Sequence, residues 1–237
     1  MAETHLQYWP ADVPLYVYAE GFDVDIPCTQ RALPAWFARW KKALAMHSDA
    51  HGLDGSRNRR GRPYDFRRDC VRFAHKVAAL TDAGMKSDGL MVWADADILT
   101  HAPIDKIWLR GLLCGDYMAW LDRERLYPEC GFVLFDCAHS RHHDFMMLYQ
   151  RYYESMEVLS ERETHDSYVL QRLVNRCVAD GWFAAPASLS GAARRAHHPL
   201  PASPLGARLD HAKGPRKAGG RTPRHEVRGR TEEHWRQ

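Results

Sequence analysis

The sequence predicts an α/β domain with a mostly parallel central sheet flanked by helices. Short runs rich in β-branched and aromatic residues alternate along the chain with segments in which apolar residues recur every three or four positions. Such alternation is typical of layered α/β domains. The chain has 237 residues, 45% of them hydrophobic, which is enough for one large core. We therefore expect a single domain over residues 1–217, followed by a basic, flexible tail over residues 218–237.

The first half of the domain is predicted to contain two strands and two helices. Residues 13–19 (VPLYVYA) form a strand-like run, bounded by Pro14 and Gly21. Helical periodicity over residues 33–44 and 66–80 predicts two amphipathic helices, the second ending at Gly84. Residues 89–94 (GLMVWA) are typical of a buried strand.

The second half repeats this alternation. Residues 103–113 are expected to form a helix with proline in its first turn. Residues 117–121 and 131–135 are expected to be strands, and residues 140–156 and 164–179 helices. These elements complete the predicted α/β layers.

Two further segments lack apolar periodicity. Residues 48–63 carry three glycines and four arginines, which predicts a basic loop. After Pro186 the helical and strand periods both fail, so we expect a loop that wraps over the domain and becomes the tail.

Composition favours a cytoplasmic protein without a transmembrane segment. No apolar run approaches the roughly 20 residues that span a bilayer, and the N-terminus lacks the pattern of a secretion signal. The six cysteines show no C-x-x-C spacing, which favours reduced thiols over a zinc or redox site. The net charge of +3 divides into −4 over residues 1–193 and +7 over residues 194–237. A basic C-terminal segment suggests a phosphate-rich ligand, or simply a solvated tail.

A pair of carboxylates follows the predicted strand at residues 89–94. Asp95 and Asp97 are two positions apart, and in an extended segment such side chains face the same way. Both can then bind one hard divalent cation at the C-terminal end of a strand, where open α/β sheets bind ligands. Asp23 and Asp25 have the same spacing but lie in a turn before Pro27. The alternative for Asp95 and Asp97 is a pair of solvated loop acids.

A third candidate ligand lies far along the chain in the pattern His211-x-x-Gly214-x-x-Lys217. Histidine binds metals, glycine lets the backbone approach an oxyanion, and lysine supplies charge for phosphate. Alone, His211 is one of fourteen histidines, and an exposed loop residue is the alternative.

These segments together resemble the GT-A glycosyltransferases, particularly family eight, which includes glycogenin-like and lipopolysaccharide-galactosyltransferase-like enzymes. The match spans about residues 65–217, roughly two thirds of the chain. Its features follow the family's order: a helix with Arg72, the pair Asp95 and Asp97, the strand ECGFVLFD at 129–136 in place of the family's Asn-x-Gly strand, the cluster His165-Asp166-Ser167, and the pattern His211-x-x-Gly214-x-x-Lys217.

The resemblance implies a bound cation and a nucleotide-sugar donor. Asp95, Asp97 and His211 are the implied ligands of Mn²⁺ or Mg²⁺, which bridges the donor's diphosphate. Four residues are implied donor contacts: Arg72 at the sugar or the first aspartate, Lys76 on the same helix, and Gly214 and Lys217 at the departing phosphates.

Two acidic residues are candidate catalytic groups. The resemblance puts Asp166 near the sugar, although a helix N-cap is its structural alternative. Glu129 is a candidate base or acceptor contact, and a buried hydrogen-bonded acid is equally compatible with its position.

The chain departs from the family at three places. Ala218-Gly219 replaces the family's Pro-Trp, and Glu129 replaces its asparagine. Only about a dozen residues precede the first predicted strand, so the family's first strand and helix are expected to be lacking.

The resemblance therefore implies a hexosyltransferase of class EC 2.4 that uses a UDP-sugar and retains the anomeric configuration. A glycan or a lipid-linked sugar is the default acceptor. A hydroxylated base in DNA is an alternative, because six arginines in and after the basic loop suit a phosphate backbone: Arg57, Arg59, Arg60, Arg62, Arg67 and Arg68. A non-catalytic nucleic-acid or sugar-phosphate binding protein, a nucleotidyltransferase, and an inverting enzyme with Asp166 as base remain open.

Overall fold

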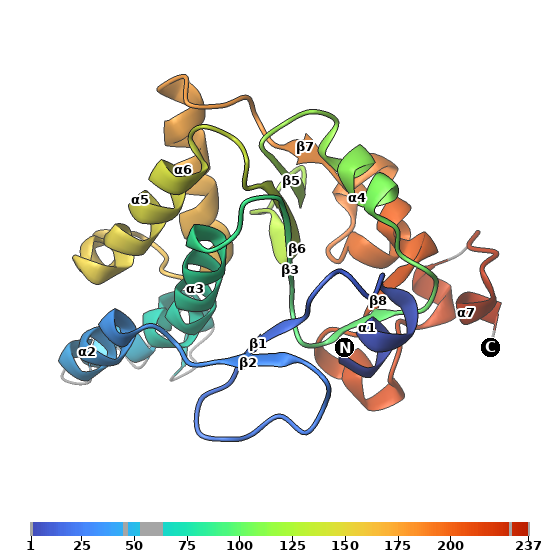
Figure 1. Ribbon diagram of the computed structural model, residues 1–237, viewed down its shortest axis with the longest axis horizontal. Helices are drawn as coiled ribbons and strands as arrows, with labels where there is room; N and C mark the ends of the chain where they lie inside the picture. Colours follow the sequence, from blue (N-terminus) through green and yellow to red (C-terminus); the bar gives the residue numbers. More distant parts are fainter. Residues whose placement is uncertain (1, 45–46, 53–63, 228, 237) are drawn as a thin grey trace.

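The computed structural model describes residues 2–44, 47–52, 64–227 and 229–236. A four-stranded sheet in the order β3-β6-β5-β7 lies at its centre, seen nearly edge-on (Figure 1). The strands of this sheet are β3 (Leu90–Ala94), β5 (Met118–Leu121), β6 (Glu129–Asp136) and β7 (Ala187–Ser188). Two strand pairs lie apart from it: β1 (Tyr16–Tyr18) with β2 (Thr29–Arg31), and β4 (Ile98–Thr100) with β8 (Leu209–His211). The α/β class predicted from the sequence is confirmed.

The central sheet is mixed, so the prediction of a mostly parallel sheet is wrong. Strand β6 lies between β3 and β5 and runs antiparallel to both, while β5 and β7 pair in parallel. The reason is the seven-residue link between β5 and β6, since a parallel crossover needs a dozen or more residues. Strands β3, β5 and β7 consequently point the same way. Their C-terminal ends meet the start of β6 at one edge of the sheet.

Helices cover both faces of the sheet. On one face lie α2 (Ala35–Leu44), α3 (Cys70–Met85), α5 (His142–Glu154) and α6 (Asp166–Ala179), at the left of Figure 1. On the other lies α4 (Lys106–Leu113), with the C-terminal part of the chain. The short helices α1 (Ala2–Tyr8) and α7 (Glu233–Arg236) lie near the two termini.

Strand β6 contributes to an apolar core on each face of the sheet. Val133 and Phe135 pack in the core beneath α3 and α5, whereas Phe132 and Leu134 pack in the core beneath α4. All four side chains are fully buried. Because both faces of β6 are covered, its sequence is continuously apolar rather than alternating.

The helices and strands predicted between residues 13 and 179 are present, with ends displaced by a few residues. The short strands β2, β4, β7 and β8 were not predicted. Each has two or three residues, too few to produce a periodic pattern. Of the predicted basic loop, residues 53–63 lie outside the described part of the chain.

The segment after residue 219, for which composition favours a flexible tail, contacts the domain around β8. Asp210 is fully buried, and its carboxylate accepts hydrogen bonds from the backbone and hydroxyl of Thr222 at 2.9 and 2.7 Å. The buried indole of Trp235 donates to the carbonyl of Gly206 at 2.9 Å. These contacts hold the strand that ends in His211.

Candidate metal centre

A tight turn joins β3 to β4 and carries Asp95 and Asp97. The amide of Ile98 donates to the carbonyl of Asp95 at 3.0 Å, and the amide of Asp95 donates to the carbonyl of Gly131 at 2.8 Å. The two carboxylates are therefore brought together by a turn anchored on β6, and not by the extended backbone that the spacing suggested.

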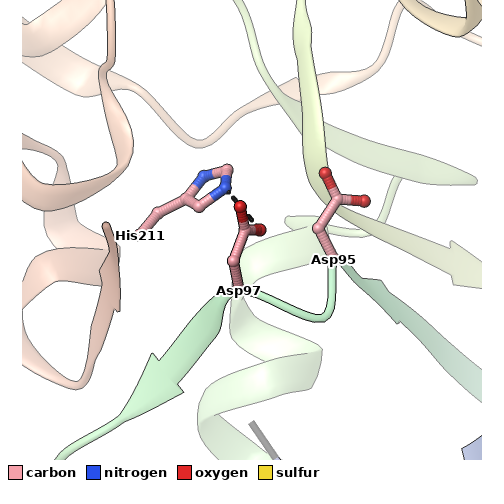
Figure 2. Close-up of side chains that lie close together, drawn as sticks. All are labelled: Asp95, Asp97 and His211. Carbon is pink, nitrogen blue, oxygen red and sulfur yellow. Dashed lines mark hydrogen bonds and ion pairs between the residues drawn. The ribbon is translucent and has the colours of Figure 1, made fainter. Parts of the chain in front are cut away.

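His211 reaches the same place from β8. Strand β8 pairs with β4 so that His211 is opposite Ile98, directly after the turn. Its imidazole is 1% exposed, and Nε2 lies 2.9 Å from Oδ1 of Asp97. Figure 2 shows Asp97 and His211 facing each other, with Asp95 beside them.

Asp95, Asp97 and His211 thus form one cluster. Each offers a ligand atom, and the three atoms lie within 4.8 Å of one another. The two aspartates are partly exposed and the histidine is buried, so the cluster opens to solvent on its acidic side. Two carboxylates and an imidazole suit Mn²⁺ or Mg²⁺ better than a soft metal.

Asp95 is held by two donors. Its Oδ1 accepts hydrogen bonds from the indole of Trp93 at 2.8 Å and from the ammonium group of Lys76 at 3.0 Å. Nothing in the sequence pattern indicated the role of Trp93. Both donors bind the same oxygen, which orients the carboxylate.

Lys76 lies between two acids. Its ammonium group is 2.8 Å from Oδ2 of Asp166 and 3.0 Å from Oδ1 of Asp95, and it also donates to the carbonyl of Cys130. Burial by itself lowers the pKa of Lys76, but the carboxylates of Asp166 and Asp95 outweigh it and raise the pKa. Lys76 is therefore a charged group that joins α3 to the metal cluster.

Asp166 is the first residue of α6 and lies in the site. The N-cap of α6 is His165, without a side-chain capping hydrogen bond, so the capping alternative for Asp166 is wrong. Burial raises the pKa of Asp166, but Lys76, with smaller contributions from His165 and Lys213, outweighs it, and the net shift is downward. The carboxylate of Asp166 is therefore ionised and forms an ion pair with Lys76.

Glu129, the first residue of β6, lies behind His211. Its carboxylate is 1% exposed, and Oε1 is 2.9 Å from Nδ1 of His211 and 3.7 Å from the ammonium group of Lys213. Nδ1 of His198 lies 3.8 Å from Oε2. We treat these contacts as ion pairs, because the contacts of Lys213 and His198 are too long for hydrogen bonds and Nδ1 of His211 has no hydrogen-bond partner among the described residues. The position matches the buried-acid alternative for Glu129.

Neighbouring charges shift the pKa values of His211 and Glu129 in opposite directions. Burial lowers the pKa of His211, but Asp97 and Glu129 outweigh it and raise the pKa to about 9. Burial raises the pKa of Glu129, while His198, His211 and Lys213 together lower it far more. Without a metal, His211 is therefore protonated at neutral pH.

The glycine at position 131, near the start of β6, leaves room for the metal cluster. A Cβ atom at this position would lie 2.8 Å from Cε1 of His211, 3.2 Å from its Nδ1 and 3.4 Å from Oδ2 of Asp95. Any side chain here would displace the imidazole. The glycine is therefore required by the cluster, and not by the backbone conformation.

The other residues predicted to contact the nucleotide-sugar donor lie outside the cluster. Arg72 is exposed one turn before Lys76 on α3, and its guanidinium donates to the hydroxyl of Tyr64 at 3.4 Å. Gly214 is exposed, has a φ of +64°, and begins a turn of 3-10 helix (Gly214–Gly219) that contains Lys217. The side chain of Lys217 lies outside the part of the chain that the structure describes.

The arginines considered for DNA have different placements. Arg68 donates to the carbonyls of Glu161 and Arg162 at 3.0 Å each, so it ties the start of α3 to the segment before α6. The guanidinium of Arg67 lies 5.9 Å from the ring of Phe66. Residues 57, 59, 60 and 62 lie outside the described residues.

The charge balance of the site fits a divalent cation. The site contains four carboxylates, those of Asp95, Asp97, Glu129 and Asp166, and two ammonium groups, those of Lys76 and Lys213. When His211 is neutral, as a metal ligand must be, two negative charges are in excess among these groups. The donor set and the charge therefore both fit Mn²⁺ or Mg²⁺.

Comparisons with protein-family models, curated proteins and solved structures found no match to this chain. Among the described residues, no helix combines the length and apolar character needed to cross a membrane.

Proposed function

We propose that the protein is a metal-dependent glycosyltransferase that moves a hexose from a UDP-sugar to an acceptor hydroxyl. One observation carries the proposal. Asp95 and Asp97 meet His211, 114 residues beyond Asp97, at the sheet edge where the strands β3, β5 and β7 end. Open α/β sheets bind ligands at this edge.

The difficult part of glycosyl transfer is the charge that develops on the departing diphosphate. Mn²⁺ or Mg²⁺ held by Asp95, Asp97 and His211 would neutralise that charge. Lys76 holds Asp95 in place and lies beside the cluster. The amide of Gly214 and the side chain of Lys217 are the expected phosphate contacts by resemblance.

The surroundings of Asp166 and Glu129 support a reaction that retains the anomeric configuration of the sugar. An inverting enzyme needs a carboxylate base free to take the acceptor's proton. Asp166 is paired with Lys76 at 2.8 Å, and Glu129 is buried behind His211. In a retaining reaction, an oxygen of the leaving phosphate can take the proton instead. NMR of the product's anomeric centre tests this point, and an inverted product would contradict it.

Glu129 then acts through His211. A carboxylate beside Nδ1 favours the tautomer that carries its proton on Nδ1 and leaves Nε2 for the metal. We therefore assign Glu129 as a positioning residue rather than a base.

Hydrolysis of the sugar nucleotide tests the proposal without knowledge of the acceptor. We expect the wild type to hydrolyse UDP-glucose or UDP-galactose only with Mn²⁺ or Mg²⁺, and Asp97→Ala to lose at least about 100-fold of that rate. Asp25→Ala is the matched control, because Asp25 is the exposed second acid of the other D-x-D sequence. Hydrolysis that is absent, or indifferent to metal and to Asp97, would favour a non-catalytic binding protein.

A further inference from the structure

A hollow of about 360 Å³ lies between the loop after β5 and the segment after β7. Small-molecule sites in proteins have volumes of roughly 300–1,000 Å³. The charged residues that line this hollow are Arg123, Glu124, Arg125, Arg194 and Arg195. A backbone hydrogen bond of 3.0 Å from Glu124 to Arg194 joins the two segments.

The hollow has an excess of positive charge. Arg194 pairs with Asp122, which directly follows β5, and Arg195 pairs with Glu124 at 2.8 Å. Among the described residues, no carboxylate lies within 4.0 Å of the guanidinium of Arg123 or of Arg125. Two guanidinium groups therefore face the hollow without an acidic partner.

Arg123 is held in place by backbone groups. Its Nε donates to the carbonyl of Tyr127 at 2.6 Å, and its Nη1 donates to the carbonyl of His197 at 2.9 Å. In the described residues, Nη2 has no hydrogen-bond partner. Burial lowers the pKa of Arg123 by more than the charges of Glu129, Cys130 and Asp166 raise it. A fixed, partly desolvated guanidinium is a strong site for a phosphate oxygen.

The hollow and the metal cluster lie at the same end of the central sheet. The loops that form it follow β5 and β7, whose C-terminal ends share a sheet edge with Asp95 at the end of β3. Leu121, the last residue of β5, pairs with Glu129. His197, which binds Arg123, precedes His198, whose Nδ1 is 3.8 Å from Glu129.

We propose that this hollow binds a phosphate group of the acceptor, so that the acceptor is a phosphate-bearing sugar or polyol. The inference rests on the proposed function, because it assigns the second substrate of that site. Arg123 and Arg125 hold the phosphate, which places the acceptor at the same end of the sheet as the metal cluster. A hollow of about 360 Å³ suits one such group better than a duplex backbone.

Binding of glucose 1-phosphate in EDTA tests the site without metal or donor. By calorimetry we expect saturable binding to the wild type, weakened about tenfold in Arg125→Gln and at least as much in Arg123→Gln. Arg110→Gln removes the same charge from an exposed position on α4, outside the hollow, and should bind like the wild type. Circular dichroism establishes that each variant is folded. Should Arg123→Gln fail to fold, Arg125→Gln decides. Equal affinity of the wild type and Arg125→Gln, or no saturable binding to the wild type, would overturn the proposal.

Vesicles distinguish a free phosphate ester from a lipid headgroup. Cosedimentation with phosphatidylcholine vesicles that contain phosphatidylinositol, lost in Arg125→Gln, would assign the site to a lipid-borne phosphate. Arg125-dependent binding of glucose 1-phosphate without such cosedimentation would assign it to a soluble acceptor. Preferential binding of a duplex DNA oligonucleotide that also depends on Arg125 would overturn the proposal in favour of a nucleic acid.

The two proposals fail separately. If the wild type hydrolyses the sugar nucleotide with metal but shows no Arg125-dependent phosphate binding, only the proposal of the acceptor site is overturned. If phosphate binding depends on Arg125 but no hydrolysis occurs, the proposal of a glycosyltransferase is overturned, and with it the assignment of the phosphate to an acceptor.

Discussion

Replacement of Gly131 by alanine should damage the metal cluster from a position that contributes no ligand. The new Cβ would lie 2.8 Å from Cε1 of His211, whereas ordinary contacts begin near 3.4 Å. The imidazole must therefore move by about 0.6 Å or more, estimated from this contact. It has little freedom to do so, because Asp97 and Glu129 hold its two nitrogens at 2.9 Å each.

The expected cost follows from these contacts. Overpacking of a rigid site costs roughly 1–3 kcal/mol, and we expect about 2 kcal/mol for Gly131→Ala. In a protein of this size that loss lowers the midpoint of thermal unfolding by about 4–8 °C. The displaced imidazole should also weaken Mn²⁺ binding at least about tenfold, as for the loss of a group that orients a ligand.

Calorimetry measures both effects. Thermal unfolding is followed in EDTA, and Mn²⁺ is titrated into each protein at the same pH. Gly89→Ala is the matched control, because a Cβ at residue 89 meets nothing within 4 Å. If Gly131→Ala unfolded at the wild-type temperature and bound Mn²⁺ with wild-type affinity, the reasoning from the His211 contact would be refuted.

Three further predictions concern the same region. Trp93→Phe removes one of the two hydrogen-bond donors to Oδ1 of Asp95. The Mn²⁺ affinity, measured by calorimetry, should therefore fall about 10- to 100-fold, while the temperature of unfolding changes little. An unchanged Mn²⁺ affinity would contradict an orienting role for Trp93. Asp210→Ala leaves the donors of the C-terminal segment without a buried acceptor and should lower the free energy of unfolding in urea by about 3 kcal/mol. In EDTA, stability should depend on pH through His211, whose pKa is about 9 in the folded protein and about 6.5 when unfolded. Folding favours the protonated form, so this stabilisation, at most about 3 kcal/mol, is complete below pH 6.5 and is lost as the pH rises through 9. Asp97→Asn should flatten that dependence in thermal unfolding followed from pH 6 to 10.

The sequence by itself determined the local features. Apolar residues at helical and strand spacing located the main elements, because burial of one face imposes that period on any sequence. The pair Asp95 and Asp97 was recognisable because it directly follows a short apolar strand. The family resemblance added His211, which no local pattern distinguishes from the other histidines.

Tertiary structure decided what depends on contacts between distant segments. Strand β6 has the same apolar composition whether it runs parallel or antiparallel, and its direction follows from the short link to β5. Arg72 and Lys76 are one helical turn apart, and it is the packing of α3 against the sheet that brings the lysine to Asp95. Glu129 became a neighbour of His211 through the pairing of β4 with β8, beside β6. The contact of Lys76 with Asp95 joins residues 19 positions apart, and that of Glu129 with His211 joins residues 82 positions apart. Hydrophobic periodicity reports only how each segment faces its surroundings, so it carries no information about which segments meet.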